Sequence, residues 1–300
     1  MSHPRKRLIV CSDDFGLDLA VNEAVEKAHR HGILTTASLM VGAPAAADAV
    51  ARARRLPELR VGLHLVLVDG FAVLPSGEIP ALVGADRKFS PNMARAGFRF
   101  FFLPGVRRQL AKELRAQFAA FRATGLALDH VNAHKHMHVH PTVARLIVEI
   151  GREYGMRAVR VPWEPVEVLR AAFPGAHHPT PLYQLWIERL RRSLGAAGLA
   201  VNDHLFGLAW SGEFNEERWL RLLPHLPDGV SEAYLHPATE RTPAVVSAMP
   251  GYCQQQELAA LLSPSVRSLI AELGVELIGY GDFAATECGR ARCRARTGSE

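Results

Sequence analysis

Short apolar runs alternate along this chain with longer segments in which apolar residues recur at helical spacing. This alternation favours a parallel sheet whose strands are joined by right-handed helical crossovers. We expect strands at residues 8–11, 35–41, 60–68, 127–133, 157–161, 200–209, 232–235 and 275–278. We expect helices at residues 19–29, 45–56, 106–123, 141–154 and 185–194. About seven such strands predict an α/β fold of the distorted, TIM-like (β/α) barrel type rather than a wide open sheet.

Two stretches depart from this rhythm. Residues 69–105 are rich in Pro, Gly and Phe, which predicts an insertion after the third strand. Residues 286–300 hold four arginines and few apolar residues, which predicts a disordered basic tail. The sequence shows no internal repeat and no clear linker, so we expect residues 1–285 to form a single domain.

The charge and cysteine content exclude several classes of protein. A net charge of +5 over 300 residues is a weak electrostatic footprint, so we expect no nucleic-acid partner. Four scattered cysteines are too few for a disulfide framework, and we expect reduced thiols. The sequence contains neither an apolar run long enough to span a membrane nor a recognisable signal peptide. We therefore expect a soluble, cytoplasmic protein.

Two adjacent carboxylates, Asp13 and Asp14, directly follow the first expected strand. Neighbouring carboxylates repel each other unless a positive group holds at least one of them. Gly16 permits a tight turn, and alternation along extended backbone points the two side chains in different directions. One of them is then able to bind a metal while the other addresses a substrate. The alternative is a helix cap followed by a solvated turn.

Histidines are concentrated in one segment, where five of the chain's 14 fall within residues 130–140. In extended backbone His134, His136 and His138 share a face, and in a helix His134 and His138 lie one turn apart. Either geometry suits a divalent metal. The alternative is an exposed His-rich loop. His64 lies inside an apolar strand pattern, which is typical either of a buried core histidine or of a metal ligand.

One carboxylate and two imidazoles around a metal leave positions for water and substrate, which is the pattern of a catalytic site. Such an ion acidifies water and polarises a carbonyl group. Amide hydrolysis also needs an acid for the departing nitrogen, and His236 follows a late strand where it fits that role. Arg160 ends another strand, where it would orient a substrate oxygen or form a structural salt bridge.

At these residues the chain resembles the YdjC-like carbohydrate deacetylases. The shared motifs are Asp13-Asp14-Phe15-Gly16, His64, the segment from Asn132 to Pro141, and His236-Pro237. The resemblance implies a distorted β/α barrel and a metal-dependent N-deacetylase. It also implies that the metal ligands are Asp14, His64 and His134, that Asp13 is the general base and His236 the general acid, and that His136 and His138 face the substrate or support the ligands.

One position departs from the family pattern. The family has Asp-Ser before the first histidine of the His-rich segment, and this chain has Asn132-Ala133. If that Asp supports a histidine ligand, Asn132 supports it only as a neutral group, and metal affinity changes. Asp129 is a candidate to compensate.

Within the family the chain is most similar to the hopanoid biosynthesis-associated deacetylases. The similarity lies in residues 132–138, 162–165 and 202–207. It implies a substrate in which a hopanoid lipid carries N-acetylglucosamine. With that substrate we expect Arg160 and Glu164 to contact it.

The aromatic run within residues 98–103 stands beside Arg107 and Arg108. This composition suits a lipid-facing groove lined by Phe100 and Phe101, with peripheral contact to a membrane. The alternative is that these phenylalanines form a core under the insertion.

Three rival functions stay open at this stage. A soluble chitooligosaccharide deacetylase keeps the chemistry and changes the substrate, and a phosphoesterase or a non-catalytic lipid- or sugar-binding protein changes the class. We expect one divalent ion, Zn²⁺, with Mg²⁺, Mn²⁺ or Ni²⁺ as alternatives. The sequence leaves the oligomeric state open, a homo-oligomer included.

Overall fold

The computed structural model describes residues 6–175 and 179–284. The tail expected at residues 286–300 lies outside this part of the chain, as do Cys288 and Cys293. The two described cysteines, Cys11 and Cys253, are not joined in a disulfide.

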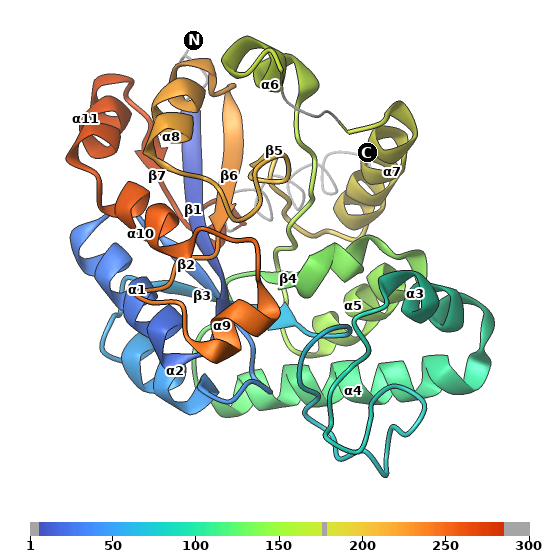
Figure 1. Ribbon diagram of the computed structural model, residues 1–300. Helices are drawn as coiled ribbons and strands as arrows, with labels where there is room; N and C mark the ends of the chain where they lie inside the picture. Colours follow the sequence, from blue (N-terminus) through green and yellow to red (C-terminus); the bar gives the residue numbers. More distant parts are fainter. Residues whose placement is uncertain (1–5, 176–178, 285–300) are drawn as a thin grey trace, which may run out of the picture.

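A curled, seven-stranded parallel sheet forms the centre of the fold (Figure 1). Its strands are β1 (Lys6–Phe15), β2 (Thr36–Leu39), β3 (Arg60–Leu65), β4 (Val131–Ala133), β5 (His204–Phe206), β6 (Gly229–Leu235) and β7 (Glu276–Leu277). The order across the sheet is β4-β3-β2-β1-β6-β5, and β7 pairs with the start of β1. The predicted α/β fold with a distorted barrel of about seven parallel strands is confirmed.

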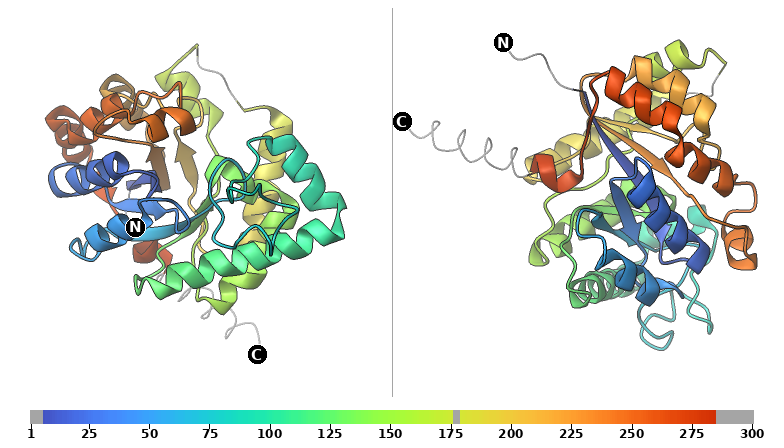
Figure 2. Two further views of the ribbon diagram at one scale, coloured as in Figure 1. Left: turned by 60° about the horizontal axis from the view of Figure 1, so that its bottom comes forward. Right: turned by 90° about the vertical axis from the view of Figure 1, so that its left-hand side faces the viewer.

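Helices surround this sheet on its outer side (Figure 2). They are α1 (Leu19–His31), α2 (Ala46–Ala53), α3 (Met93–Phe102), α4 (Pro104–Ala123), α5 (Pro141–Glu153), α6 (Val166–Ala172), α7 (Pro181–Ala196), α8 (Glu216–Leu222), α9 (Pro243–Ala248), α10 (Gln254–Leu262) and α11 (Pro264–Glu272). Two short 3₁₀ turns, η1 (His134–Val139) and η2 (Leu223–His225), complete the described elements. Several helices begin with proline, which loses no hydrogen bond in the first turn.

The central strand β1 is buried along almost its whole length, from Leu8 to Phe15. A parallel strand covered on both faces carries a continuous apolar run rather than an alternating pattern, as residues 8–11 do. Asp18 then caps α1 by accepting a hydrogen bond from the amide of Ala20 at 2.8 Å.

Five of the eight expected strands are shorter than their sequence patterns indicated, and the strand expected at residues 157–161 does not form. Residues 157–161 and 200 take part only in isolated bridges, Val131 with Val159 and Ala158 with Ala200. The side chain of Asn202 replaces part of the missing ladder, because it accepts from the amide of Val161 and donates to its carbonyl oxygen at 2.7 and 2.9 Å. Few backbone hydrogen bonds therefore join residues 157–161 to the rest of the sheet.

The stretch expected as an insertion contains irregular backbone followed by α3, a helix that the sequence pattern did not predict. Buried Glu113 on α4 accepts hydrogen bonds from the amides of Val73 and Leu74 at 2.8 and 3.0 Å. Gln117, one turn further along α4, bonds both backbone groups of Val66. Helix α4 thus holds this stretch against the sheet. No helix in the described part of the chain is long and apolar enough to cross a membrane.

We expect Gly62→Ala to destabilise the sheet beside the site. A Cβ atom on Gly62 would come 2.4 Å from the ring of His130. That ring cannot move easily, because Ser38 and Asp129 bond its two nitrogens at 3.0 and 2.9 Å. Overpacking of this kind costs about 1–3 kcal/mol, which urea unfolding would detect. In the matched control Gly77→Ala, the added carbon meets no atom within 4 Å. Equal stability of the two variants would contradict this packing argument.

Candidate active site

The residues expected to carry chemistry meet at one end of the sheet. Asp13 and Asp14 lie near the end of β1, His64 near the end of β3, His134 directly after β4, and His236 directly after β6. In parallel sheets of this type, the carboxyl ends of the strands lie on the same side and carry the functional groups. Side chains as far apart in the sequence as Asp13 and His236 are thereby brought into one site.

Asp14 receives two imidazoles on a single carboxylate oxygen. Its Oδ1 lies 3.2 Å from Nε2 of His64 and 3.1 Å from Nδ1 of His134. The backbone at Asp14 has a φ of 61°, a left-handed conformation that turns its side chain away from that of Asp13. The structure therefore brings together the three residues that the family resemblance implied as metal ligands.

The donor set fits a divalent cation. One ligand atom each from Asp14, His64 and His134 lies within 4.8 Å of the others, and all three residues are buried. The second oxygen of Asp14, Oδ2, is buried and has no hydrogen-bond partner among the described residues. A buried carboxylate oxygen without a partner is costly, and a cation bound beside it would satisfy it.

The charges around Asp14 favour its ionised form. Burial alone would raise the pKa of this carboxyl group, but His134 and His64 beside it lower the pKa well below its usual range. The pKa of His64 is correspondingly raised, since Asp13 and Asp14 outweigh the effect of burial on its ring.

Asn132 fixes the orientation of the His64 ring. The amide nitrogen of Asn132 donates to Oδ1 of Asp13 at 3.2 Å, and an ionised carboxylate is only an acceptor. The amide oxygen of Asn132 must then face Nδ1 of His64, 2.7 Å away, and this nitrogen donates its proton. Nε2 of His64 is left with its lone pair toward the Asp14 side, the form in which imidazole binds metal.

The departure from the family pattern thus concerns His64 rather than His134. Asp129, the candidate for compensation, bonds His130 at 2.9 Å and the amide of Gly281 at 2.7 Å instead. The carboxylate of Asp129 is thus engaged by His130 and Gly281, away from the ring of His64.

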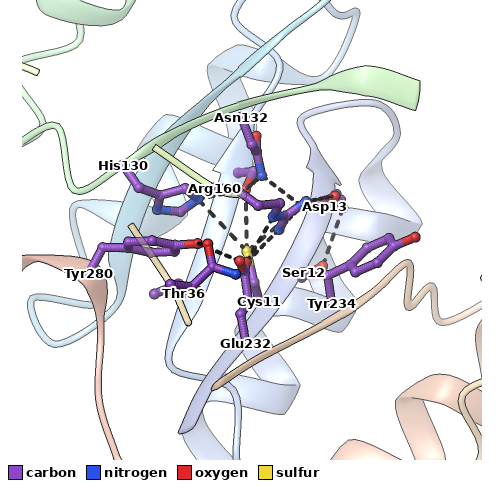
Figure 3. A network of polar contacts seen from close by, with 12 residues as sticks. Cys11, Ser12, Asp13, Thr36, His130, Asn132, Arg160, Glu232, Tyr234 and Tyr280 are labelled. Atoms are coloured by element: carbon purple, nitrogen blue, oxygen red, sulfur yellow. Dashed lines mark hydrogen bonds and ion pairs between the residues drawn. The ribbon is translucent and has the colours of Figure 1, made fainter. Parts of the chain in front are cut away.

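Asp13 belongs to a buried ionic network (Figure 3). Arg160, which is fully buried, donates to both oxygens of Asp13 at 2.5 and 2.9 Å and to Glu232 at 2.6 and 3.0 Å. Tyr280 donates to the second oxygen of Glu232 at 2.5 Å. Burial would raise the pKa of Asp13, but the Arg160 guanidinium outweighs burial and holds this pKa well below its usual range. Asp13 is therefore ionised at neutral pH.

A cavity of about 140 Å³ opens onto this site. Its lining comes from six separate parts of the chain and includes both aspartates: Asp13, Asp14, His64, Ala133, His134, Lys135, His136, Ser211, Tyr234, His236, Ala248, Met249 and Tyr252. The predicted catalytic pair and the three predicted metal ligands therefore face a single enclosed space.

His236 lies at this cavity between two tyrosine rings. Its ring centroid is 5.6 Å from that of Tyr234 and 5.0 Å from that of Tyr252. Burial lowers the pKa of His236, and the charges of Asp14 and Asp13 oppose that effect. The backbone amide of His236 donates to buried Glu257 at 2.7 Å, which holds the turn after β6 in place. Burial raises the pKa of Glu257 to about 7.

His136 and His138 occupy different environments. His136 lines the cavity, with Nε2 lying 3.3 Å from the hydroxyl of Tyr234. His138 is buried beneath it and is not part of the described cavity lining. Burial and the nearby Arg160 lower the pKa of His138 to about 3, so this ring is neutral. Both ring nitrogens of His138 lack a hydrogen-bond partner among the described residues, so a contact with substrate or a supporting role stays a prediction for both histidines.

Two residues expected to contact substrate are occupied by the protein itself. Arg160 is wholly used by Asp13 and Glu232, which makes it the structural salt bridge of the two alternatives. Glu164 accepts hydrogen bonds from three successive backbone amides, those of residues 207–209, at 3.0–3.1 Å. Burial raises the pKa of Glu164 to about 7. Neither side chain belongs to the described cavity lining, so both expectations of substrate contact are corrected here.

The aromatic run does not reach the cavity either. Phe100 is buried in the core, which agrees with the alternative that these phenylalanines form a core under the insertion. Its ring centroid lies 6.1 Å from that of His140. Phe101 is 49% exposed on the outer surface of α3. The expectation that Phe100 and Phe101 line the substrate site is therefore corrected, because one is in the core and the other faces outward.

Several residues of the site carry no clear sequence signal. Ser211 and Tyr252 bond each other at 2.8 Å, but they come from loops whose approach depends on the tertiary fold. Tyr234 precedes His236 by two residues, so strand alternation predicts that they share a face. That signal was available in the sequence.

The fold and the site together define a class of protein. This is a curled parallel β/α sheet that presents a carboxylate and two imidazoles, a set suited to a divalent ion, beside a second carboxylate and a histidine. Residues 7–272 match the family described as YdjC-like protein. The chain belongs to the YdjC-like family, and the resemblance stated from its motifs is confirmed at that level.

Relatives named carbohydrate deacetylases align with nearly the whole chain. A carbohydrate deacetylase of Geobacillus stearothermophilus is 32% identical over 279 residues, covering 92% of this chain and 97% of the relative. A carbohydrate deacetylase of Mus musculus is 32% identical over 308 residues, covering 94% and 96%. A crystal structure of an Enterococcus faecalis V583 protein is 23% identical, with a TM-score of 0.72 and coverage of 93% and 99%. That likeness shows the fold.

We expect Arg160→Met to be strongly destabilising, because it leaves Asp13 and Glu232 buried without their cation. Breaking a buried ion pair in this way costs about 3–5 kcal/mol. Urea unfolding would measure the loss against Arg115→Met, which removes a half-exposed ion pair with Glu153 worth about 1 kcal/mol or less. Equal losses of stability in the two variants would show that Asp13 and Glu232 do not depend on the buried guanidinium.

We expect Asn132→Leu to weaken metal binding without removing any proposed ligand. The variant cannot accept the Nδ1 proton of His64, so the ring loses its fixed orientation. Loss of such supporting bonds typically lowers metal affinity about 10–100-fold, which a Zn²⁺ titration against a chelator would resolve. Ser38→Ala is the matched control, since it removes another bond of Asn132 and leaves the one to His64. Unchanged affinity in Asn132→Leu would contradict this role.

Proposed function

We propose that this chain is a metal-dependent N-deacetylase that removes the acetyl group from an N-acetylated amino sugar and releases acetate. The observation that carries this proposal is the cavity that Asp13, Asp14, His64, His134 and His236 line together. Family membership and the carbohydrate deacetylases among the relatives support the same chemistry.

Asp14, His64 and His134 would hold one divalent ion. Two imidazoles and a single carboxylate suit Zn²⁺, whereas Mg²⁺ prefers an oxygen-rich set, so we propose Zn²⁺. When bound at such a site, a divalent ion polarises a carbonyl oxygen and acidifies water.

Asp13 would position the attacking water and accept its proton. Its low pKa keeps the carboxylate ionised, which is the state that accepts a hydrogen bond from water. Arg160 and Asn132 fix both the position and the orientation of this carboxylate. A fixed carboxylate aligns water with the carbonyl carbon and so reduces the entropy cost of the attack.

His236 would protonate the departing amine. Burial lowers the pKa of this ring, which makes its protonated form a ready proton donor. The negative charges of Asp14 and Asp13 favour formation of that protonated form. Tyr234 and Tyr252 pack against the ring and limit its rotation.

The size of the cavity limits what enters it. Sites that enclose a whole drug-sized ligand measure about 300–1,000 Å³. A cavity of about 140 Å³ therefore takes the acetamide group and part of one sugar ring, and the rest of the substrate lies outside. We propose N-acetylglucosamine carried by a hopanoid lipid as the substrate, on the resemblance of residues 132–138, 162–165 and 202–207. N,N'-diacetylchitobiose is the soluble alternative.

Metal removal and two substitutions test the chemistry. A chelator should abolish acetate release, and Zn²⁺ should restore it. Asp13→Asn and His236→Ala should each lower kcat by a factor of about 10²–10⁴ while the protein still binds Zn²⁺. Acetate release from the glucosamine-bearing lipid and from N,N'-diacetylchitobiose, measured side by side, decides between the two substrates.

Asp48→Asn is a control for loss of a carboxylate, because Asp48 pairs with Arg52 on α2 outside the cavity lining. Its activity should equal that of the unaltered protein. Full activity in Asp13→Asn would show that another group accepts the proton. Full activity and full metal affinity in Asp14→Asn would exclude the proposed metal site.

A further inference from the structure

Exposed apolar side chains are concentrated on two helices. Of the eleven large hydrophobic side chains exposed in the described part of the chain, eight lie on α3, on the residue after it, or on α7. They are Met93, Phe98, Phe101, Phe102, Leu103, Leu182, Leu185 and Trp186, and we call them the α3/α7 patch. A concentration of this kind usually marks a binding surface.

Both helices present their exposed side chains at the same spacing. On α3, Phe98, Phe101 and Phe102 stand at positions i, i+3 and i+4, and the rings of Phe98 and Phe102 lie 4.6 Å apart. Leu182, Leu185 and Trp186 repeat this spacing on α7. The buried residues of α7, such as Ile187 and Leu190, face the core, so the patch is a second apolar face on each helix.

The two faces meet at the start of α5. The ring of Phe101 lies 6.2 Å from that of His140, and Trp186 donates to the carbonyl oxygen of Val139 at 2.9 Å. Two adjacent residues therefore contact α3 and α7, and both helices flank α5 (Figures 1 and 2). A groove of about 440 Å³ between α5 and α7 begins at Val139 and Trp186 and extends the apolar surface.

On α3 and the first part of α4, the charge beside the patch has one sign. Residues 91–112 contain five cations, Arg95, Arg99, Arg107, Arg108 and Lys112, and no acidic residue. Arg189 is exposed on α7 and belongs to the lining of the groove. Aromatic and aliphatic side chains bordered by arginines are the composition of helices that lie in the headgroup region of anionic membranes.

The patch is also linked to the candidate active site through one short segment. His134 and His136 line the cavity, while Val139 and His140, at the other end of the same segment, contact α7 and α3. A molecule held at the patch is thus only a few residues of chain from the reacting groups.

We propose that the α3/α7 patch binds the surface of an anionic lipid bilayer, so that the enzyme takes an amino sugar whose lipid part stays in the membrane. The identity of the substrate in this proposal rests on the proposed deacetylase function, whereas the binding of the patch to a bilayer does not. A second copy of this chain is a poorer occupant, because a two-fold interface would set the same cationic row against itself.

The test is sedimentation of the purified full chain with vesicles, carried out without turnover. Vesicles of phosphatidylcholine with phosphatidylglycerol should carry the protein down, and vesicles of phosphatidylcholine alone should carry much less. Added salt should weaken the binding, because the arginine contribution is screened. Trp186 is 40% exposed, so its fluorescence should shift to the blue on binding, and Trp186→Phe should lose that shift.

Phe98→Ser combined with Phe102→Ser and Leu185→Ser should reduce sedimentation to the level seen without vesicles. Arg95→Gln with Arg108→Gln should remove the preference for phosphatidylglycerol. Leu19→Ser is the matched control, because Leu19 is 59% exposed, close to the 61% of Phe98, and lies on α1. The circular dichroism spectrum and the urea unfolding midpoint should stay unchanged in all these variants, which shows that they fold.

The outcomes separate this inference from the proposed function. Hydrolysis without vesicle binding would overturn the inference alone, and vesicle binding without hydrolysis would overturn the function alone. Light scattering could instead show a dimer that is absent in the triple serine variant and is unaffected by vesicles. That result would assign the patch to a second copy. Retention on nucleic acid in place of vesicles would likewise overturn the membrane assignment.

Discussion

The buried guanidinium of Arg160 is the interaction on which both the fold and the site depend. It extends from the irregular segment 157–161 to Asp13 on β1 and Glu232 on β6, at 2.5 and 2.6 Å. The backbone of segment 157–161 pairs with its neighbours only through isolated bridges. The ion pairs of Arg160 therefore help to hold this segment against β1 and β6. Because a buried charge must be fully paired, the position of Asp13 is determined by the same contacts.

A single backbone feature separates the tasks of the two adjacent aspartates. The left-handed conformation at Asp14 costs roughly 1–3 kcal/mol for a residue with a side chain, and it persists because the contacts around it demand it. Asp13 joins the network of Arg160 and Asn132, while Asp14 joins His64 and His134. The amide of Asn132 links these two groups, since the charge of Asp13 sets its orientation and thereby the ring nitrogen that His64 presents.

The sequence predicted those parts of the molecule that depend on local pattern. The buried run of β1 followed from the apolar pattern, and the meeting of Asp14, His64 and His134 followed from the motif and the polarity of a parallel sheet. The errors concern long-range pairing. Whether Arg160 and Glu164 face a substrate or the protein depends on partners up to 147 residues away, and no local pattern records those partners.

The overall charge of the buried network explains why a divalent ion suits the site. Three carboxylates, those of Asp13, Asp14 and Glu232, are buried here, and the guanidinium of Arg160 pairs with only two of them, Asp13 and Glu232. When all are ionised, two negative charges stay uncompensated in a region from which water is largely excluded, and such an excess is costly. A doubly charged cation beside Asp14 Oδ2 removes the whole excess, whereas a monovalent ion removes half of it. Without such an ion, protonation of His64, whose pKa is raised, supplies part of the same compensation. The charge of the proposed cofactor therefore follows from the carboxylates and the arginine that also hold the sheet together.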